Sequence, residues 1–363
     1  MKNKISILFP LENSITVNYT LYPLWVSKYR SKFDFYTSAE DLIKKDKNSI
    51  LVLFGKYIAK MNHSNKKELV YILRNKYKKF VFFDDLDGSE SHFLDLLPFF
   101  DLYFKKQLFK NKLNYLDSYY GNRIYTDFYY KKFGITENPL PIPLPKFIGD
   151  VGELHKFRLG WNLGIGQISG SRGISFKFVK HIYKFGGSFG MGLIQKRFPK
   201  SKKIPNPINS KCQARFGFEG YRPTVGYQRK LFLELVKNNP LIYSGKIPFS
   251  EYQSELKNTK AVLSPFGWGE VCFRDFEAIV NGSVLVKPNM DHIVTWPDLY
   301  QADKTYVPIS WDGSDMVEKI ENILSIQEKI DDIRFEAWST LKASYSRLDN
   351  RVSEFIDDIE NLK

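Results

Sequence analysis

The sequence predicts an α/β protein of two units in tandem, closed by C-terminal helices. Short apolar runs alternate with segments of helical spacing in both halves of the chain, which is typical of parallel strands joined by helical crossovers. From Ser314 to the C-terminus the spacing is helical throughout. The length of 363 residues suits two domains of ordinary size, and a hydrophobic content of 43% provides enough apolar residues for two cores.

Buried strands are expected in the N-terminal half wherever a short apolar run is bounded by polar residues or glycine. These runs are Ile5–Phe9, Ile50–Phe54, Phe80–Phe83, Leu102–Phe104 and Phe157–Asn162. The polar, basic stretch Phe198–Lys211 interrupts the alternation, and its prolines fit neither a regular helix nor a central strand. We therefore expect one domain over residues 1–205 and a second over residues 206–363.

The same alternation resumes in the C-terminal half. Expected strands are Gln213–Phe218, Leu241–Tyr243, Ala261–Ser264 and Val284–Lys287, and expected helices are Gly226–Lys237 and Phe249–Lys257. This order of elements predicts a second parallel sheet that resembles the first in its organisation.

The composition narrows the class of protein. Lys and Arg exceed Asp and Glu by 54 to 40, a formal charge of +14, which suits an anionic partner or reflects a generally lysine-rich composition. The two cysteines, Cys212 and Cys272, argue against a disulfide framework and a cysteine-based zinc site. No run approaches the ~20 apolar residues of a membrane span, and Pro10 and Glu12 break the first apolar run. We expect a cytoplasmic protein, soluble or peripheral on the membrane.

The segment LSPFGWGEVCFRDFEAIVNGSVLVKP, from Leu263 to Pro288, contains the strongest candidate site. A helix over Val271–Asn281 would place its apolar residues on one side. Glu270, Arg274 and Glu277, spaced four and three residues apart, would then lie together on the opposite side. The alternative is a solvated helix face with ordinary ion pairing.

The loop before this helix favours a ligand site. Gly267 and Gly269 permit a close approach of the backbone to a ligand. The loop follows a strand, and open α/β sheets bind ligands at the carboxyl ends of their strands. Helix N-termini and arginine bind phosphate, whereas carboxylates accept hydrogen bonds from hydroxyl groups. These groups together predict a nucleotide-sugar site.

This order of strand, "SP", Gly-rich loop, glutamate, helix with "EA" and strand "VLV" resembles the donor-binding core of GT-B glycosyltransferases. The resemblance extends over roughly residues 215–315. It implies two Rossmann-like domains facing each other across a cleft, with the nucleotide sugar held by the C-terminal domain. Glu277 would bind the donor ribose and Glu270 the donor sugar. The family pattern has seven residues between its two glutamates, whereas six separate Glu270 from Glu277 here, which turns one side chain by ~100°.

The resemblance also implies basic residues that face the diphosphate. Arg215 lies in the first expected strand of the C-terminal domain, Arg222 follows that strand, and Lys246 follows the second, near the strand ends where the family often places basic residues. It implies a hexosyl or related transferase that needs no metal or other cofactor. The acceptor would be a glycan or lipid-linked glycan, in a bacterial surface polysaccharide pathway such as capsule, O-antigen or lipopolysaccharide synthesis.

Carboxylates follow the expected strand Phe80–Phe83, in the run DDLDGSESH. An inverting transferase needs a general base near the acceptor hydroxyl, and we favour Asp85 or Asp87 for this role. A retaining enzyme needs no such base, and an ordinary turn would also use Asp and Gly. Asp85-Leu86-Asp87 also has the Asp-x-Asp spacing by which metal-dependent GT-A-type transferases hold a divalent cation, which is an alternative.

Aromatic and basic residues are interleaved from Tyr103 to Phe133. Such a surface suits peripheral docking on an anionic membrane or stacking on single-stranded nucleic acid, and a domain core with solvated lysines would have the same pattern. A non-catalytic basic module that binds nucleic acid or anionic glycan is therefore the rival function. We expect the transferase, with a nucleotide-sugar donor and no nucleic-acid partner.

Overall fold

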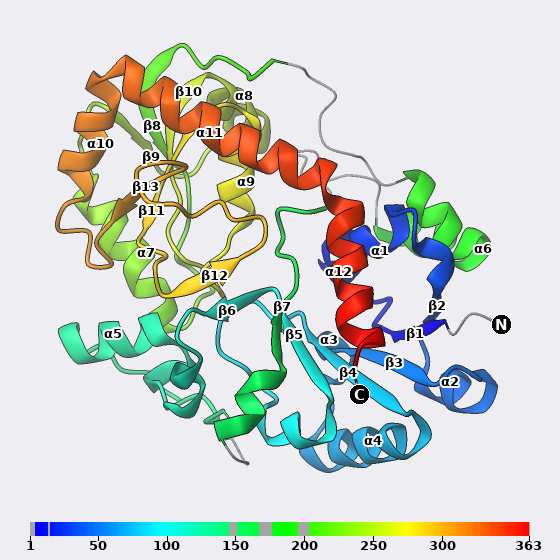
Figure 1. Cartoon of the computed structure of the whole chain (residues 1–363). Helices are drawn as coiled ribbons and strands as arrows, with labels where there is room; N and C mark the ends of the chain where they lie inside the picture. Colours follow the sequence, from blue (N-terminus) through cyan, green and yellow to red (C-terminus); the bar gives the residue numbers. More distant parts are fainter. Residues whose placement is uncertain (1–3, 14, 145–150, 167–175, 195–202, 363) are drawn as a thin grey trace.

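The structure is a computed structural model that describes residues 4–13, 15–144, 151–166, 176–194 and 203–362. It consists of two lobes, each built on a parallel sheet, which lie one above the other in Figure 1. Among the described residues, no helix combines the length and the apolar character that crossing a membrane requires.

The N-terminal lobe contains a parallel sheet of strand order β2-β1-β3-β4-β5-β7. Its strands are β1 (Ile5–Leu8), β2 (Phe33–Tyr36), β3 (Ile50–Phe54), β4 (Lys79–Asp84), β5 (Leu102–Lys105) and β7 (Phe157–Leu159). Its main helices are α1 (Tyr22–Val26), α2 (Ala39–Lys45), α3 (Gly55–Ile58), α4 (His63–Lys76) and α6 (Phe176–Ile194). The central strands are buried along their whole length, as continuous apolar runs require in a sheet covered on both faces.

The C-terminal lobe contains a parallel sheet of strand order β13-β11-β10-β8-β9. Its strands are β8 (Asn209–Ala214), β9 (Ile242–Ser244), β10 (Thr259–Leu263), β11 (Val284–Pro288) and β13 (Val307–Ile309). Its main helices are α7 (Pro223–Leu235), α8 (Phe249–Asn258), α9 (Phe273–Val280) and α10 (Met316–Ser325). In both lobes the first strand lies between the second and the third, which gives the doubly wound order 2-1-3-4-5, a close relative of the Rossmann order. The predicted fold class is confirmed.

The two lobes are joined by secondary structure from both. β6 (Gln107–Phe109) pairs antiparallel with β12 (Ile293–Thr295), and α5 (Ile124–Phe133) packs against α7. Both β6 and α5 belong to the aromatic and basic segment noted above. Many of its rings are fully buried: Tyr103, Phe104, Phe109, Tyr115, Tyr125 and Tyr129. This segment therefore forms mainly protein core, including the junction between the lobes.

The last two helices connect the lobes along one side of the molecule (Figure 1). α11 (Gln327–Ser346) lies against the C-terminal lobe, and α12 (Leu348–Glu360) returns to the N-terminal lobe. Phe355 of α12 packs with its ring 4.7 Å from that of Phe104 on β5. By this packing α12 belongs to the N-terminal core.

Candidate active site

A pocket of about 310 Å³ lies between the two lobes at the carboxyl ends of their strands. The N-terminal lobe contributes Ile15, Asp87 and Leu163. The C-terminal lobe contributes the loop and first turns of α9, together with Tyr221 and Arg229. Of the residues predicted from the sequence, Asp87, Gly267, Gly269, Arg274 and Glu277 line this pocket. We call it the interlobe pocket.

The N-terminus of α9 is held in place by a buried polar cluster. Asp275 accepts a hydrogen bond from the backbone N–H of Cys272 (3.0 Å), which caps the helix. The same carboxylate forms a fully buried ion pair with Lys287 of β11 (3.1 Å) and accepts from the hydroxyls of Ser264 and Tyr300. This network fixes where the following side chains of α9 point.

Arg274 and Glu277 lie three residues apart on α9 and both line the interlobe pocket. The Arg274 Nη2 atom donates to the carbonyl oxygen of Arg215 (2.9 Å), while its Nε atom is buried and has no hydrogen-bond partner among the described residues. The Tyr252 hydroxyl donates to Glu277 Oε2 (2.7 Å). A guanidinium and a carboxylate are thus held side by side at the pocket.

Glu270 does not lie beside Arg274 and Glu277 at the interlobe pocket, where the sequence had predicted it. α9 begins at Phe273, so Glu270 precedes the helix, and its side chain is fully buried. It accepts from the Ser89 hydroxyl (2.5 Å) and the Ser89 N–H (3.1 Å), which belong to the N-terminal lobe. Burial acts to raise its pKa, but His292 and Ser89 hold the pKa of Glu270 below its usual value. Glu270 therefore links the two lobes as an ionised carboxylate.

Gly269 lets the Gly-rich loop approach the backbone of the N-terminal lobe closely. A Cβ atom at Gly269 would lie 1.6 Å from the carbonyl oxygen of Asp87, so no other residue fits this loop contact. A Cβ atom at Gly267 would meet only ordinary contacts of 3.5 Å. The Gly267 carbonyl accepts from the Tyr125 hydroxyl (2.8 Å). The Gly-rich loop is thus fixed against the N-terminal lobe.

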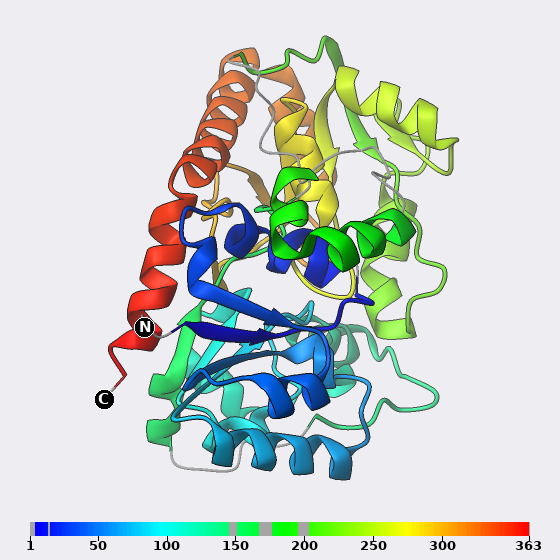
Figure 2. The same cartoon turned by 90° about the vertical axis from the view of Figure 1, so that its right-hand side faces the viewer.

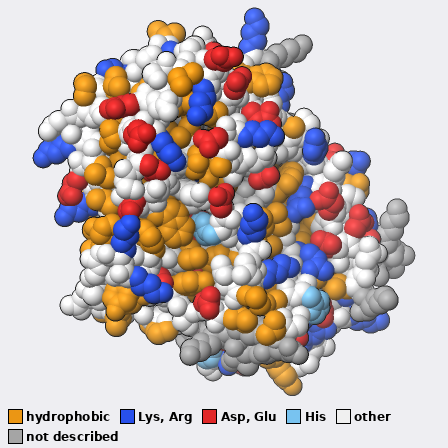
Figure 3. Space-filling view, turned by 60° about the vertical axis from the view of Figure 1, so that its left-hand side comes forward, with side chains coloured by type: hydrophobic (Ala, Val, Ile, Leu, Met, Phe, Trp, Pro, Cys, Tyr) orange, Lys and Arg blue, Asp and Glu red, His pale blue; other side chains and the backbone are white. Residues whose placement is uncertain are grey.

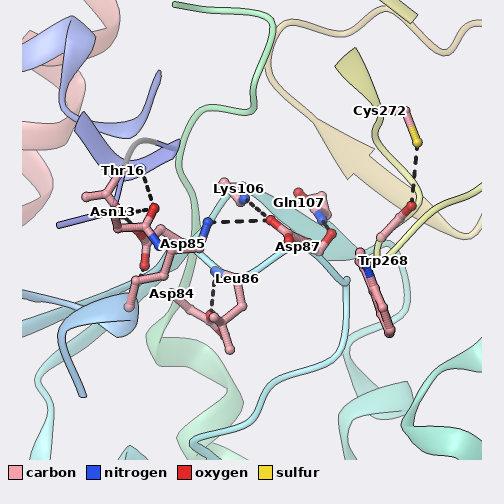
Figure 4. Close-up of polar contacts among 12 residues, drawn as sticks. Asn13, Thr16, Asp84, Asp85, Leu86, Asp87, Lys106, Gln107, Trp268 and Cys272 are labelled. Atoms are coloured by element: carbon pink, nitrogen blue, oxygen red, sulfur yellow. Dashed lines mark hydrogen bonds and ion pairs between the residues drawn. The ribbon is translucent and has the colours of Figure 1, made fainter. Parts of the chain in front are cut away.

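Asp85 and Asp87 follow β4 but point to different surroundings (Figure 4). Asp85 is fully buried and accepts from the Thr16 hydroxyl (2.5 Å) and the Lys56 N–H (2.7 Å). Burial raises the pKa of Asp85. Asp87 is about one-third exposed and lines the interlobe pocket. Of the two candidates for the base, only Asp87 reaches the pocket.

Two buried lysines surround the Asp87 carboxylate. Lys106 Nζ lies 3.1 Å and Lys56 Nζ 3.5 Å from Asp87 Oδ1. Burial acts against ionisation, but the two ammonium groups lower the pKa of Asp87 to about 2. Burial and the charge of Lys56 lower the pKa of Lys106 to about 8. Two cations already beside Asp87 disfavour a divalent metal bound by Asp85 and Asp87 together, since like charges repel.

The remaining predicted basic residues lie outside the pocket lining. Arg215 forms an ion pair with Glu255 (2.7 Å) and also donates to the Ser244 carbonyl. Arg222 donates to the Gly121 carbonyl (2.7 Å), and the exposed Lys246 pairs with Glu219 (3.0 Å). Each thus has a partner within the protein.

Arg229 of α7 was not predicted, although it lines the pocket. It is 5% exposed and donates to the carbonyls of Gly217 and Phe266, the second at 2.8 Å. Its position in the middle of a helix gave no sequence signal, because only the packing of α7 against the Gly-rich loop brings it to the pocket.

Two Rossmann-like lobes that enclose a pocket at the carboxyl ends of their strands define the GT-B architecture. No protein-family model and no curated protein matches the chain.

Solved structures with similar arrangements include three glycosyltransferases, each matched over nearly the whole of both chains. One is an α-glucosyltransferase in complex with UDP (12% identity, 99% of this chain and 100% of that one, TM-score 0.45). Another is a glycosyltransferase from Rickettsia africae ESF-5 (10%, 100% and 100%, 0.47). The third is the β-glucosyltransferase of T4 phage (11%, 98% and 99%, 0.43). Similarity at this level gives no evidence on activity, so function has to be inferred from the pocket itself.

Proposed function

We propose that the protein is a glycosyltransferase that moves a sugar from a nucleotide-sugar donor to a glycan or lipid-linked glycan acceptor. One observation supports this most: the interlobe pocket brings Arg274 and Glu277 of one lobe together with Asp87 of the other. Arginine binds a phosphate through two parallel hydrogen bonds, and a carboxylate accepts from sugar hydroxyls. The pocket thus contains the groups that a nucleotide sugar requires.

In the proposed reaction the two lobes have different roles. Arg274 and the N-terminus of α9 bind the donor diphosphate, and Glu277 accepts from the ribose hydroxyls. Asp87 accepts the proton of the acceptor hydroxyl, and the oxygen of that hydroxyl attacks the anomeric carbon of the donor sugar. The bond from that carbon to the diphosphate breaks, and the diphosphate leaves with the electron pair. This is an inverting transfer with Asp87 as general base. Lys56 and Lys106 lower the pKa of Asp87 to about 2, so it is ionised at neutral pH but is a weak base.

The resemblance of the Leu263–Pro288 segment supports a hexosyl or related transferase of a bacterial surface polysaccharide pathway. On the face shown in Figure 3, basic and acidic side chains are intermixed and hydrophobic side chains gather where the lobes meet. A continuous basic groove, which nucleic-acid binding would favour, is not seen on this face among the described residues. The face shown thus does not favour a basic binding module, and the groups that line the interlobe pocket favour the transferase.

A thermal-shift panel tests the proposed function. Nucleoside diphosphates with each base, and a sample of heparin and duplex DNA, are added to the purified protein. We expect one nucleoside diphosphate to raise Tm, because a ligand that binds only the folded state stabilises it, by ~2.7 kcal/mol at a hundredfold excess over Kd. A shift with heparin or DNA alone, weakened by salt, would favour the binding module instead.

We also propose that the reaction needs no metal. Arg229, Arg274 and the N-terminus of α9 line the interlobe pocket and would stabilise the leaving diphosphate, so product formation should persist in EDTA. The measurement is the rate of nucleoside diphosphate release with and without EDTA. The opposite result is that EDTA abolishes activity and that removing the EDTA restores it only when Mn²⁺ or Mg²⁺ is added. That result would support the metal-dependent alternative.

A further inference from the structure

Helix α6 of the N-terminal lobe exposes large apolar side chains to solvent. Phe185 is 82%, Phe189 57% and Leu193 71% exposed. The helix bends at Gly187, which has a φ of 51°. Both halves of α6 are anchored on their inner side. Tyr183, before the bend, packs against Phe9 of the core with ring centroids 5.5 Å apart, and Met191, after the bend, is fully buried. The exposed residues are therefore held at the surface by a fixed inner face.

Cations accompany these apolar side chains. The sequence of α6 contains lysines and a histidine but no Asp or Glu. Lys184 is exposed, with its ammonium 5.9 Å from the Phe185 ring, and the guanidinium of Arg30 lies 4.8 Å from the Phe189 ring. Arg30 lies outside α6, in a short helical turn over Arg30–Lys32. Aromatic residues of a helix with lysine and arginine beside them are typical of elements that lie in the interface of an anionic bilayer.

We infer that α6 docks on the surface of an anionic phospholipid bilayer, with Phe185, Phe189 and Leu193 at the boundary of headgroups and acyl chains. Lys184 and Arg30 would face the lipid phosphates. A second copy of the chain fits this surface less well, because it would bring two cationic helices of two +14 proteins together.

The position of α6 gives the docking a consequence. Figure 2 shows α6 across the middle of this face, beside α1 and level with the junction of the lobes. Docking through α6 would place that junction near the membrane surface, within reach of a lipid-linked acceptor. The docking itself does not depend on the proposed sugar transfer.

Co-sedimentation with vesicles tests this surface. The wild-type protein should sediment with vesicles of phosphatidylcholine and phosphatidylglycerol, more weakly with pure phosphatidylcholine, and less at high salt. The variant with Phe185→Ser, Phe189→Ser and Leu193→Ser should bind the mixed vesicles at least about tenfold more weakly, since it loses most of the buried apolar area. A control variant with Phe335→Ser and Ile208→Ser, which are 59% and 78% exposed elsewhere, should bind as the wild type does.

Three results would overturn the inference. One is that the wild type does not sediment with the mixed vesicles, and another is that the triple variant binds them like the control. The third is a wild-type dimer in sedimentation velocity that only the triple variant abolishes, which would show that a second copy covers this surface. Unchanged Tm and nucleotide response in the triple variant show that it is folded, and they keep this test separate from that of sugar transfer.

Discussion

Asp87→Asn should lower kcat by ~10²-fold, the low end of the contribution of a positioned general base, because the pKa of Asp87 is lowered to about 2. The amide keeps the size of the side chain but does not take up the acceptor proton. Affinity for the nucleotide sugar should change little, because Asp87 lies across the interlobe pocket from the donor-binding groups. The measurement is single-turnover release of nucleoside diphosphate from the donor identified by the thermal-shift panel.

Asp85→Asn is the matched control for this experiment. Asp85 has the same chemistry two residues away, but it is buried and bonded to Thr16 and Lys56 outside the pocket lining. It should affect Tm more than the chemical step. A folded Asp87→Asn variant with wild-type kcat would contradict an inverting mechanism based on Asp87, and the anomeric configuration of the product would then be expected to be retained.

Glu277→Ala should weaken donor binding by about 10- to 150-fold, or ~1.5–3 kcal/mol, the range for hydrogen bonds to a charged group. The carboxylate lies in the pocket and is oriented by the Tyr252 hydroxyl (2.7 Å). Removing it leaves the ribose hydroxyls without their acceptor. Isothermal calorimetry with the nucleotide sugar measures the loss directly.

Two further variants separate binding from packing. Glu251→Ala removes an exposed carboxylate from α8, and its affinity should equal that of the wild type. Tyr252→Phe removes only the hydroxyl that orients Glu277, so a smaller loss is expected than for Glu277→Ala. If Glu277→Ala binds the donor normally and keeps its Tm, the carboxylate is an ordinary surface group and the proposed donor site is wrong.

The strands of the N-terminal sheet could be predicted because they are continuous apolar runs. Ile50–Phe54 is fully buried as expected, and its bounds agree with those of β3. β2 (Phe33–Tyr36) was missed because it is a short edge strand with a charged residue, Asp34, and its side chains after Phe33 are only half-buried. β8 was expected at Gln213–Phe218 but spans Asn209–Ala214, since polar residues in its first half conceal the strand.

Local sequence patterns were enough to predict most of the strands and helices and to name several residues of the proposed site. The spacing of Arg274 and Glu277 on one helix, after a Gly-rich loop, follows from helix geometry and needs no information from the rest of the chain. Asp87 was among the candidates for the same reason, because it follows a buried strand at the edge where parallel sheets bind ligands.

Which of these groups share a pocket depends on contacts between residues that are far apart in the sequence. Glu270 bonds to Ser89, 181 residues away, and Gly269 packs on the Asp87 backbone, so contacts between the lobes remove one predicted carboxylate from the site and bring another to it. Arg229 reaches the pocket only because α7 packs beneath the Gly-rich loop. Such partners are set by how the two sheets face each other, and no periodicity within one segment encodes that arrangement.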